Sequence, residues 1–434
     1  MHPSIAIALL VLCPPVFGQD SVSFRGNATH SGIFDAAAPK TFHGVKWQFH
    51  TAGQVVSSPA VSAGSVYFGS NDHHLYALDL ATGAEKWKFK TEGRIPSSPA
   101  VANGLVFFLS YDSNFYALDA ATGTLKWKFA TGGERRFAAK HIHGMEPAAE
   151  TMPDPFDFFL SSPAVSGGLV YFGSSDGNVY ALDATTGGLK WKFQTGDIVH
   201  SSPAIAGGTV FVGSWDTYLY ALDTSSGKEK WRFKTGEDHE IYNQIGIQAS
   251  PAFADGVVYF GCRDSKFYAL DANTGKQLWA FSNKGSWVIN SAAVRDGRVY
   301  FATSDTGLFH ALDAKSGAPL YSLDFNHWPM FSSPAIAGNA LYLGSHQGRL
   351  LAIDLSSQRL AWKFETEAAK SNGPALTDVH GAPNYAAAFA GPFYDEIVAG
   401  VQKMLSLGAI LSSPVVAGDT VIFGSTDGNL YAIQ

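Results

Sequence analysis

Three residues near position 140 have types and a spacing that could ligate a metal ion. His141 and His143 form a His-x-His pair, and Glu146 follows three positions later. Imidazole nitrogens and a carboxylate are ligands that transition metals such as zinc accept. No second cluster of such residues completes the shell in the sequence, so a loop lying over the protein surface is the alternative interpretation.

A second group of residues predicts a polar and aromatic ligand pocket. At one position that recurs along the chain the residue type keeps changing; Asn71 is one candidate there, and the more informative ones are Tyr111, Trp215, Arg263 and His346. Further candidates lie just before or within a recurring Ser-Ser-Pro segment: His200, Asn243, Gln248, Trp287 and Asn290. Taken singly, each also fits a solvated loop residue. Together they have the aromatic faces, amides and positive charge that bind small ligands.

The repeated segments that must position these residues predict the fold. The second Ser of the Ser-Ser-Pro-Ala segment, or its equivalent, occurs at Ser58, Ser98, Ser162, Ser202, Ser250, Ser291, Ser333 and Ser413. Each unit contains four short strand-like runs joined by tight turns, many with glycine next to Asn or Asp. Four-stranded units of this length repeated around an axis predict an all-β, eight-bladed β-propeller.

Proline and the chain ends predict the strand order and the closure of the ring. Proline recurs in the first strand of the units, as at Pro59 and Pro99, and a residue that cannot donate to a β-ladder belongs at a sheet edge. The first strand should therefore be the innermost. The last unit lacks a Trp strand, whereas a spare one, 45–51, precedes the first unit. We expect this N-terminal strand to complete the eighth blade.

The motif Ala-x-Asp-x-x-Thr-Gly-x-x-x-Trp occurs in full at 77–87, 117–127, 181–191 and 269–279, and with substitutions at 221–231, 311–321 and 352–362. It resembles the tryptophan-docking repeat of the pyrroloquinoline quinone (PQQ) repeat β-propellers, which are similar in fold to quinoprotein alcohol dehydrogenases. A flat indole on each outer strand can pack against the neighbouring blade, and the Asp can fix the turn that follows. The resemblance therefore implies a scaffold, and leaves the activity open.

Composition and the N-terminus indicate where the protein acts. Residues 1–18 have the apolar core and small residues of a signal peptide cleaved before Gln19, so we expect a single propeller over 19–434, exported to the periplasm or secreted. No later tract reads as a transmembrane segment. The net charge of −7 argues against a nucleic-acid partner. Without the leader only Cys262 remains, which excludes an internal disulfide, and we expect a monomer.

The large insertions predict which face carries the function. They occupy about 132–160, 236–248 and 366–410, and all lie between a Trp strand and the next first strand. The last contains apolar residues at helical spacing from Phe393 to Leu405, which predicts a short helix covering the rim. The insertions should therefore surround one mouth of the channel, where a protein or small-molecule ligand would bind.

Three functions fit the resemblance. The first is a binding platform like the propeller component of outer-membrane protein assembly. The alternative is a quinoprotein dehydrogenase that uses PQQ and Ca²⁺, which requires a carboxylate and an amide converging on the metal. Against it, the sequence has neither adjacent cysteines nor a Cys-x-x-Cys-His haem motif. The third is a carbohydrate-binding module that uses aromatic platforms such as Tyr111 and Trp215.

Overall fold

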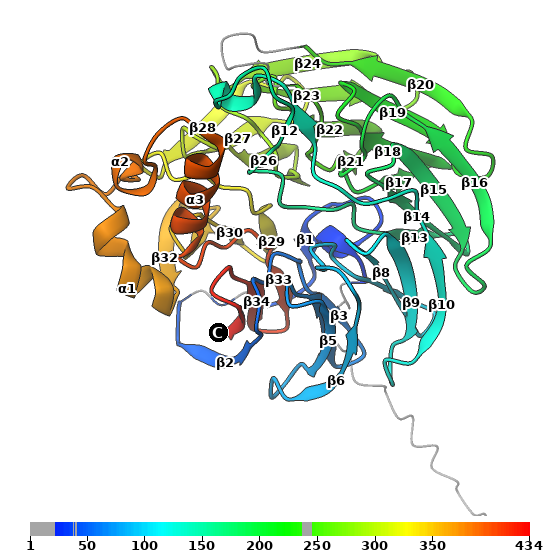
Figure 1. The fold of residues 1–434 in the computed structure, drawn as a ribbon, viewed down its shortest axis with the longest axis horizontal. Coiled ribbons are helices and arrows are strands. Elements are labelled where there is room, and N and C mark those ends of the chain that lie inside the picture. The colour runs from blue at the N-terminus through cyan, green and yellow to red at the C-terminus, as the bar shows by residue number, and fades with distance from the viewer. Residues whose placement is uncertain (1–21, 38, 40, 237–244) are drawn as a thin grey trace, which may run out of the picture.

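The computed structural model describes residues 22–37, 39, 41–236 and 245–434. Eight four-stranded antiparallel blades surround a central axis (Figure 1), which confirms the predicted eight-bladed β-propeller. The predicted leader and Asn243 lie outside the described residues.

The blades follow one another along the chain. Blade 1 contains β3 (Ala60–Ser62), β4 (Ser65–Gly69), β5 (His74–Asp79) and β6 (Glu85–Lys90); blade 2, β7 (Ala100–Ala102), β8 (Leu105–Ser110), β9 (Asn114–Asp119) and β10 (Leu125–Ala130); blade 3, β13 (Ala164–Ser166), β14 (Leu169–Gly173), β15 (Asn178–Asp183) and β16 (Leu189–Gln194); blade 4, β17 (Ala204–Ala206), β18 (Thr209–Gly213), β19 (Tyr218–Asp223) and β20 (Glu229–Lys234). Blade 5 contains β21 (Ala252–Ala254), β22 (Val257–Gly261), β23 (Lys266–Asp271) and β24 (Gln277–Ser282); blade 6, β25 (Ala293–Arg295), β26 (Arg298–Ala302), β27 (Leu308–Asp313) and β28 (Pro319–Asp324); blade 7, β29 (Ala335–Ala337), β30 (Ala340–Gly344), β31 (Arg349–Asp354) and β32 (Arg359–Glu365); blade 8, β33 (Val415–Ala417), β34 (Thr420–Gly424), β35 (Asn429–Ile433) and β2 (Val45–His50).

The first strand of each blade is the innermost, as the proline pattern predicts, because these strands contact one another around the ring. The recurring serines join them. The backbone N–H of Ser58 donates to Oγ of Ser98 at 3.0 Å, and Ser413 closes the circle by donating to Oγ of Ser58 at 2.9 Å. This ring uses the N–H groups and hydroxyls of serines, so it does not need the backbone N–H that proline lacks. The Ser-Ser-Pro segment therefore suits an inner edge.

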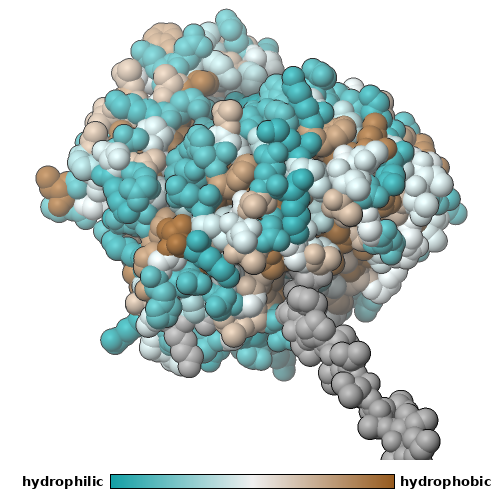
Figure 2. Space-filling view, turned by 90° about the horizontal axis from the view of Figure 1, so that it is seen from below, coloured by the Kyte–Doolittle hydropathy of each residue, from teal (hydrophilic) through white to brown (hydrophobic). Residues whose placement is uncertain are grey.

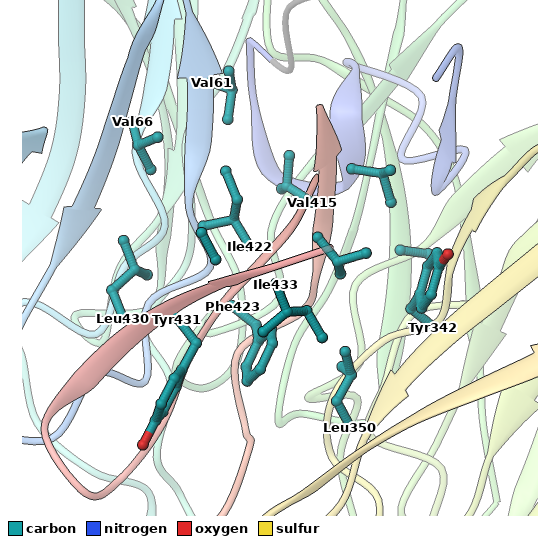
Figure 3. Packing of buried hydrophobic residues seen from close by; sticks show 14 of the residues in the cluster. Val61, Val66, Tyr342, Leu350, Val415, Ile422, Phe423, Leu430, Tyr431 and Ile433 are labelled. Carbon is teal, nitrogen blue, oxygen red and sulfur yellow. The ribbon is translucent and has the colours of Figure 1, made fainter. Parts of the chain in front are cut away.

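β2 closes the ring by pairing antiparallel with β35, with Gln48 opposite Tyr431, so the N-terminal strand completes the eighth blade as expected. Behind this junction lies a core shared by blades 7, 8 and 1. Figure 3 shows its side chains, among them Val66, Ile422 and Tyr342, all 0% exposed. Burial of this continuous apolar surface joins the two ends of the chain.

The segment before β2 lies across the channel end opposite the insertions, which the sequence pattern did not predict. It contains the 3₁₀ turn η1 (Phe24–Gly26) and β1 (Ile33–Phe34), which pairs parallel with β29 and lies near the middle of the ring in Figure 1. The buried Arg25 guanidinium donates to the carbonyls of Pro334 and Ala292, and burial lowers its pKa to about 9. The segment thereby contacts several inner strands at once and stabilises their arrangement.

Six of the seven outer-strand indoles donate a hydrogen bond to a backbone carbonyl of the next blade. The Nε1 of Trp191 donates to the carbonyl of Thr224 at 2.9 Å, and its ring covers Gly227. Gly227 has φ +69°, and a Cβ added there would lie 2.6 Å from the indole. The Thr-Gly turn therefore needs glycine for its backbone conformation and for the close approach of the tryptophan.

We expect Gly227→Ala to lower the free energy of unfolding by roughly 2–4 kcal/mol, because it combines a left-handed backbone with a steric overlap. Gly208→Ala is a matched control: its φ is +71°, but the nearest atom to its added Cβ is 3.9 Å away. The control should cost only about 1–2 kcal/mol in denaturant unfolding. Equal losses in the two variants would contradict the packing role of the indole.

Two insertions have defined structure on one face of the ring. The last insertion forms α1 (Glu367–Leu376), α2 (Tyr385–Ala388) and α3 (Tyr394–Leu405), and α3 is the predicted helix. The first insertion, 132–160, contains β11 (Ala138–Ala139), the 3₁₀ turn η2 (Ile142–Gly144) and β12 (Met152–Pro153). None of the helices in the described ranges is long and apolar enough to cross a membrane.

Candidate functional site

Arg263 lies on the inserted face, between two indoles. Its guanidinium carbon is 4.3 Å from the ring centroid of Trp215 and 4.4 Å from that of Trp287. The three residues come from the loops that end β18 and β22 and precede β25, and Arg263 is only 1% exposed. The structure thus brings together three of the predicted pocket residues, but as a closed stack.

The first insertion supplies the negative charge for this arginine. Nη1 of Arg263 donates to Oδ2 of Asp154 at 2.5 Å, while Nε and Nη2 donate to Oε1 of Gln248 at 3.1 and 2.6 Å. Gln248 in turn donates through Nε2 to Oδ1 of Asp157 at 3.2 Å. Both aspartates are 0% exposed, so the insertion is held in the channel mouth by a connected buried network.

Two histidines complete the network. An imidazole nitrogen of His143 lies 2.9 Å from Oδ1 of Asp154, and Nδ1 of His200 lies 2.9 Å from Oδ1 of Asp157. Burial alone would raise the pKa of Asp154, but the charges of Arg263 and His143 hold it well below its usual range. Burial alone would lower the pKa of His200, but Asp157 and Glu134 raise it above its ordinary value. We call Asp154, Asp157, His143, His200, Gln248 and Arg263 the mouth network.

The raised pKa of His200 predicts a pH dependence of stability. A histidine whose pKa is higher in the folded state stabilises fully below its unfolded value of about 6.5 and loses that contribution as pH rises through the folded value. The free-energy difference between wild type and His200→Gln should therefore be larger at pH 6 than at pH 9. Urea unfolding at both pH values measures it, and a difference that grows with pH would contradict the assignment.

The residues of the predicted metal site do not come together. His141 is exposed, His143 is bound to Asp154, and Oε2 of Glu146 accepts the backbone N–H of Ala148 at 2.9 Å. Across the described ranges, no group of three or more His, Cys, Asp or Glu residues could hold a metal ion. The stretch instead forms part of the loop that fills the mouth.

The mouth network does not fit PQQ with Ca²⁺. A calcium site would need the oxygens of a carboxylate and an amide directed at one gap. Here Gln248 turns its Nε2 toward Asp157 and its oxygen toward Arg263. Both oxygens of Asp157 are also occupied, since Oδ2 accepts the backbone N–H of Phe137 at 2.8 Å. Phe137 stacks on Trp215 at 4.1 Å, so with Arg263 nearby this indole has no free face for a quinone.

The remaining predicted residues lie beside two cavities or within the frame. Asn71 and Tyr111 line a polar cavity of about 210 Å³, together with Arg94 and Arg136. Trp287 and His346 line a largely apolar cavity of about 270 Å³ between the ring and α3, which we call the rim cavity. Asn290 donates to the carbonyls of Ala302 at 2.8 Å and Met330 at 2.9 Å, so it joins blades 6 and 7.

The predictions missed the two aspartates of the first insertion. Asp154 and Asp157 lie in the stretch Pro-Asp-Pro-Phe-Asp-Phe-Phe, where carboxylates alternate with aromatic residues, and this mixture was a signal for a segment buried against the mouth.

The aromatic candidates are not exposed as the platforms of a carbohydrate-binding module would be. Trp215 is 1% exposed, and Arg94 lies 4.8 Å from the ring of Tyr111.

Comparison with known proteins decides the family. The model of the family described as outer membrane protein assembly factor BamB matches residues 44–150, 143–280 and 240–434, which together span most of the chain. The chain belongs to this family. No curated protein sequence matches it.

Solved structures show the same fold in proteins of different activities. BamB from Moraxella catarrhalis is 16% identical, with a TM-score of 0.66 over 90% of this chain and 99% of that one. Quinohemoprotein alcohol dehydrogenase from Comamonas testosteroni is 14% identical, with a TM-score of 0.69 over 96% of this chain and 80% of that one. A europium-containing methanol dehydrogenase is 15% identical, with a TM-score of 0.68 over 96% and 98%. At these identities the likeness concerns the fold alone.

Proposed function

We propose that this protein is an exported, monomeric propeller that acts as a binding platform for a partner protein in outer-membrane protein assembly. The family description supports the process, and the apolar, small-residue pattern of residues 1–18 supports export. The partner would bind the inserted face, because that face carries the elements by which this chain departs from the regular repeat.

The observation that carries the proposal is the closed channel mouth. In a quinoprotein dehydrogenase the mouth must leave room for a cofactor and a metal ion. In this chain the same place is filled by the mouth network, whose carboxylates and amide are already paired with Arg263, His143 and His200. A mouth of this kind holds the insertions in place and leaves their outer surface for contact with a partner.

The last insertion offers the apolar side chains for such a contact. Val379 is 95% exposed and Phe393 57%, the highest values among the large apolar residues of the described chain. In the view of Figure 2, hydrophobic residues are scattered among hydrophilic ones, as on an ordinary soluble surface. Exposed Val and Phe side chains on an inserted segment are typical of protein contacts.

The experiment compares two double variants for binding to the purified outer-membrane assembly complex of the source cell. Val379→Ser with Phe393→Ser should weaken binding at least tenfold. Leu189→Ser with Leu278→Ser, at positions 47% and 49% exposed on outer strands, should leave it unchanged. Wild-type protein that does not bind the complex, or equal losses in the two double variants, would contradict the proposal.

A further inference from the structure

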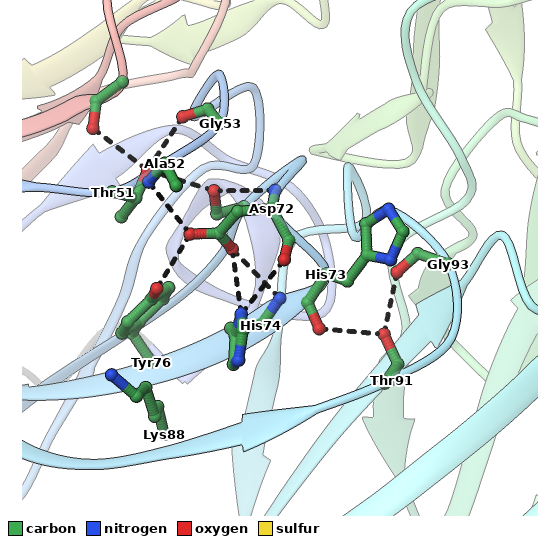
Figure 4. Close-up of polar contacts among 12 residues, drawn as sticks. Thr51, Ala52, Gly53, Asp72, His73, His74, Tyr76, Lys88, Thr91 and Gly93 are labelled. Carbon is green, nitrogen blue, oxygen red and sulfur yellow. Dashed lines mark hydrogen bonds and ion pairs between the residues drawn. The ribbon is translucent and has the colours of Figure 1, made fainter.

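A carboxylate that recurs in the blades has a structural partner in six of them. In blade 1 the hydroxyl of Tyr76 donates to Oδ2 of Asp72 at 2.8 Å, and the backbone N–H of Ala52 donates to the same oxygen at 3.1 Å (Figure 4). The same tyrosine–aspartate bond, four residues apart, joins Tyr116 to Asp112, Tyr180 to Asp176, Tyr220 to Asp216, Tyr268 to Asp264, and Tyr431 to Asp427. In these blades the aspartate stabilises the loop between the second and third strands.

Blade 6 keeps the aspartate, Asp305, but not its partner. His310 occupies the tyrosine position, opposite Phe301, and its Nδ1 is hydrogen-bonded to Oγ of Ser322 at 2.7 Å. The loop is also one residue longer, with 303–307 between β26 and β27 where blade 1 has 70–73 between β4 and β5. Sequence similarity to the other blades predicts that Asp305 stabilises its turn in the same way. The structure differs, because blade 6 has no tyrosine hydroxyl at this position and its loop has a different length.

The carboxylate of Asp305, which lacks the tyrosine partner of the other blades, faces the rim cavity. Asp305 lines this cavity and is itself exposed to solvent. It forms no ion pair within the described part of the chain. Burial raises its pKa, while the hydroxyl of Ser304 and the charges of His143 and Arg263 act in the opposite direction. Arg263 and His143, which itself lines the cavity, are both paired with Asp154. The cavity thus contains a carboxylate that no ion pair of the described residues neutralises.

The rest of the rim cavity is mostly aromatic, and Val401, Met404 and Leu405 of α3 complete its apolar wall. Its rings are Phe156 and Phe158 from the first insertion, Trp287 and Phe331 from loops that precede inner strands, and Tyr385 and Phe389 from the last insertion. Aromatic faces attract a cation within about 6 Å of the ring centre, and the attraction strengthens where water is excluded. Two histidines line the cavity: burial lowers the pKa of His346 to about 3, so that it is uncharged at neutral pH and does not repel a cation, and His143 is paired with Asp154.

The polar atoms limit what kind of cation fits. A primary ammonium has three N–H donors to satisfy, and this lining offers few acceptors besides Asp305. A methylated ammonium has few N–H donors or none, and its methyl groups can pack against an apolar wall. The Nε1 of Trp287 is buried and has no hydrogen-bond partner among the described residues, so it can donate to an oxygen elsewhere on the ligand.

We propose that the rim cavity binds a small quaternary ammonium compound, whose charge is balanced by Asp305 and whose methyl groups contact the aromatic rings. This binding does not depend on the proposed partner protein, since every group involved belongs to this chain. It also gives a reason for the two insertions to meet over blades 6 and 7.

Isothermal titration with choline tests the proposal. The matched probe is the uncharged alcohol in which carbon replaces the choline nitrogen. We expect choline to bind at least tenfold more tightly than this alcohol. Asp305→Asn should weaken choline binding at least tenfold and leave the alcohol unaffected. Asp395→Asn, which removes an exposed charge on α3 outside the cavity, should change neither.

Thermal unfolding of Asp305→Asn shows whether the variant is still folded, and so separates loss of the site from loss of the fold. Tyr385→Leu is a second variant, which keeps the carboxylate and removes one aromatic ring of the rim cavity. Equal affinity for choline and the alcohol, or unchanged choline binding by a folded Asp305→Asn protein, would overturn the role of the charge. No binding of choline by the wild-type protein would overturn the site itself.

Discussion

Arg263→Ala should lower the free energy of unfolding by about 3–5 kcal/mol, the range for breaking a buried ion pair by removing one partner. The variant leaves Asp154 and the oxygen of Gln248 without their donor in a place that water does not reach. It also removes the group between Trp215 and Trp287. Denaturant unfolding followed by tryptophan fluorescence reports the change directly, because both indoles lie beside the substitution.

The control for this prediction is Arg232→Ala. Arg232 also lies over an aromatic ring, 5.0 Å from that of Tyr218, and also faces a carboxylate, 3.8 Å from Glu229. Its side chain is 52% exposed, so water screens both interactions and the loss should be below about 1 kcal/mol. If both variants lost the same small amount, the mouth network would not hold the first insertion in the channel.

Trp47→Ala should have a similarly large effect, about 3–5 kcal/mol, the usual cost of removing a buried tryptophan. Trp47 is 8% exposed, donates to the carbonyl of Leu80 at 3.0 Å, and covers Gly83 of blade 1. It is the indole that joins the eighth blade to the first. Its loss removes packing and a hydrogen bond at the one junction where the ring is closed by separate ends of the chain.

Trp362→Ala tests whether that junction is special. Trp362 is on the outer strand of blade 7, is only half-buried, and packs against Phe42, itself 38% exposed. We expect roughly half the loss seen for Trp47→Ala, since less apolar area returns to water. A larger loss for Trp362 than for Trp47, measured in the same denaturant, would show that closure depends on other contacts.

The fold could be predicted because every blade repeats the same local information. Glycine turns, the inner-strand prolines and the spare strand at 45–51 each predict the same ring. The channel end crossed by Arg25 and β1 could not, because that segment has no repeat and its partners are carbonyl groups of distant inner strands. Irregular segments whose contacts are mostly with backbone atoms leave little pattern in a sequence.

The candidate site was only half predictable, for a related reason. Trp215, Gln248, Arg263 and His200 stand out because they depart from the repeat, and the structure gathers them. Their partners Asp154 and Asp157 belong to an insertion whose path over the ring is set by tertiary contacts. Asp305 was hidden by its similarity to the other turn aspartates, although His310 and the longer loop were visible signs that its environment differs.

The most direct test of the platform assignment is a titration of the purified protein with PQQ, with and without Ca²⁺, followed by tryptophan fluorescence and heat. Trp215 and Trp287 make the fluorescence sensitive to any ligand that enters the mouth. Because the mouth network fills that place, we predict no saturable binding in either condition, at concentrations that saturate a quinohemoprotein dehydrogenase used as the positive control. Saturable binding that requires Ca²⁺ would contradict the account and identify the protein as a quinone-binding propeller.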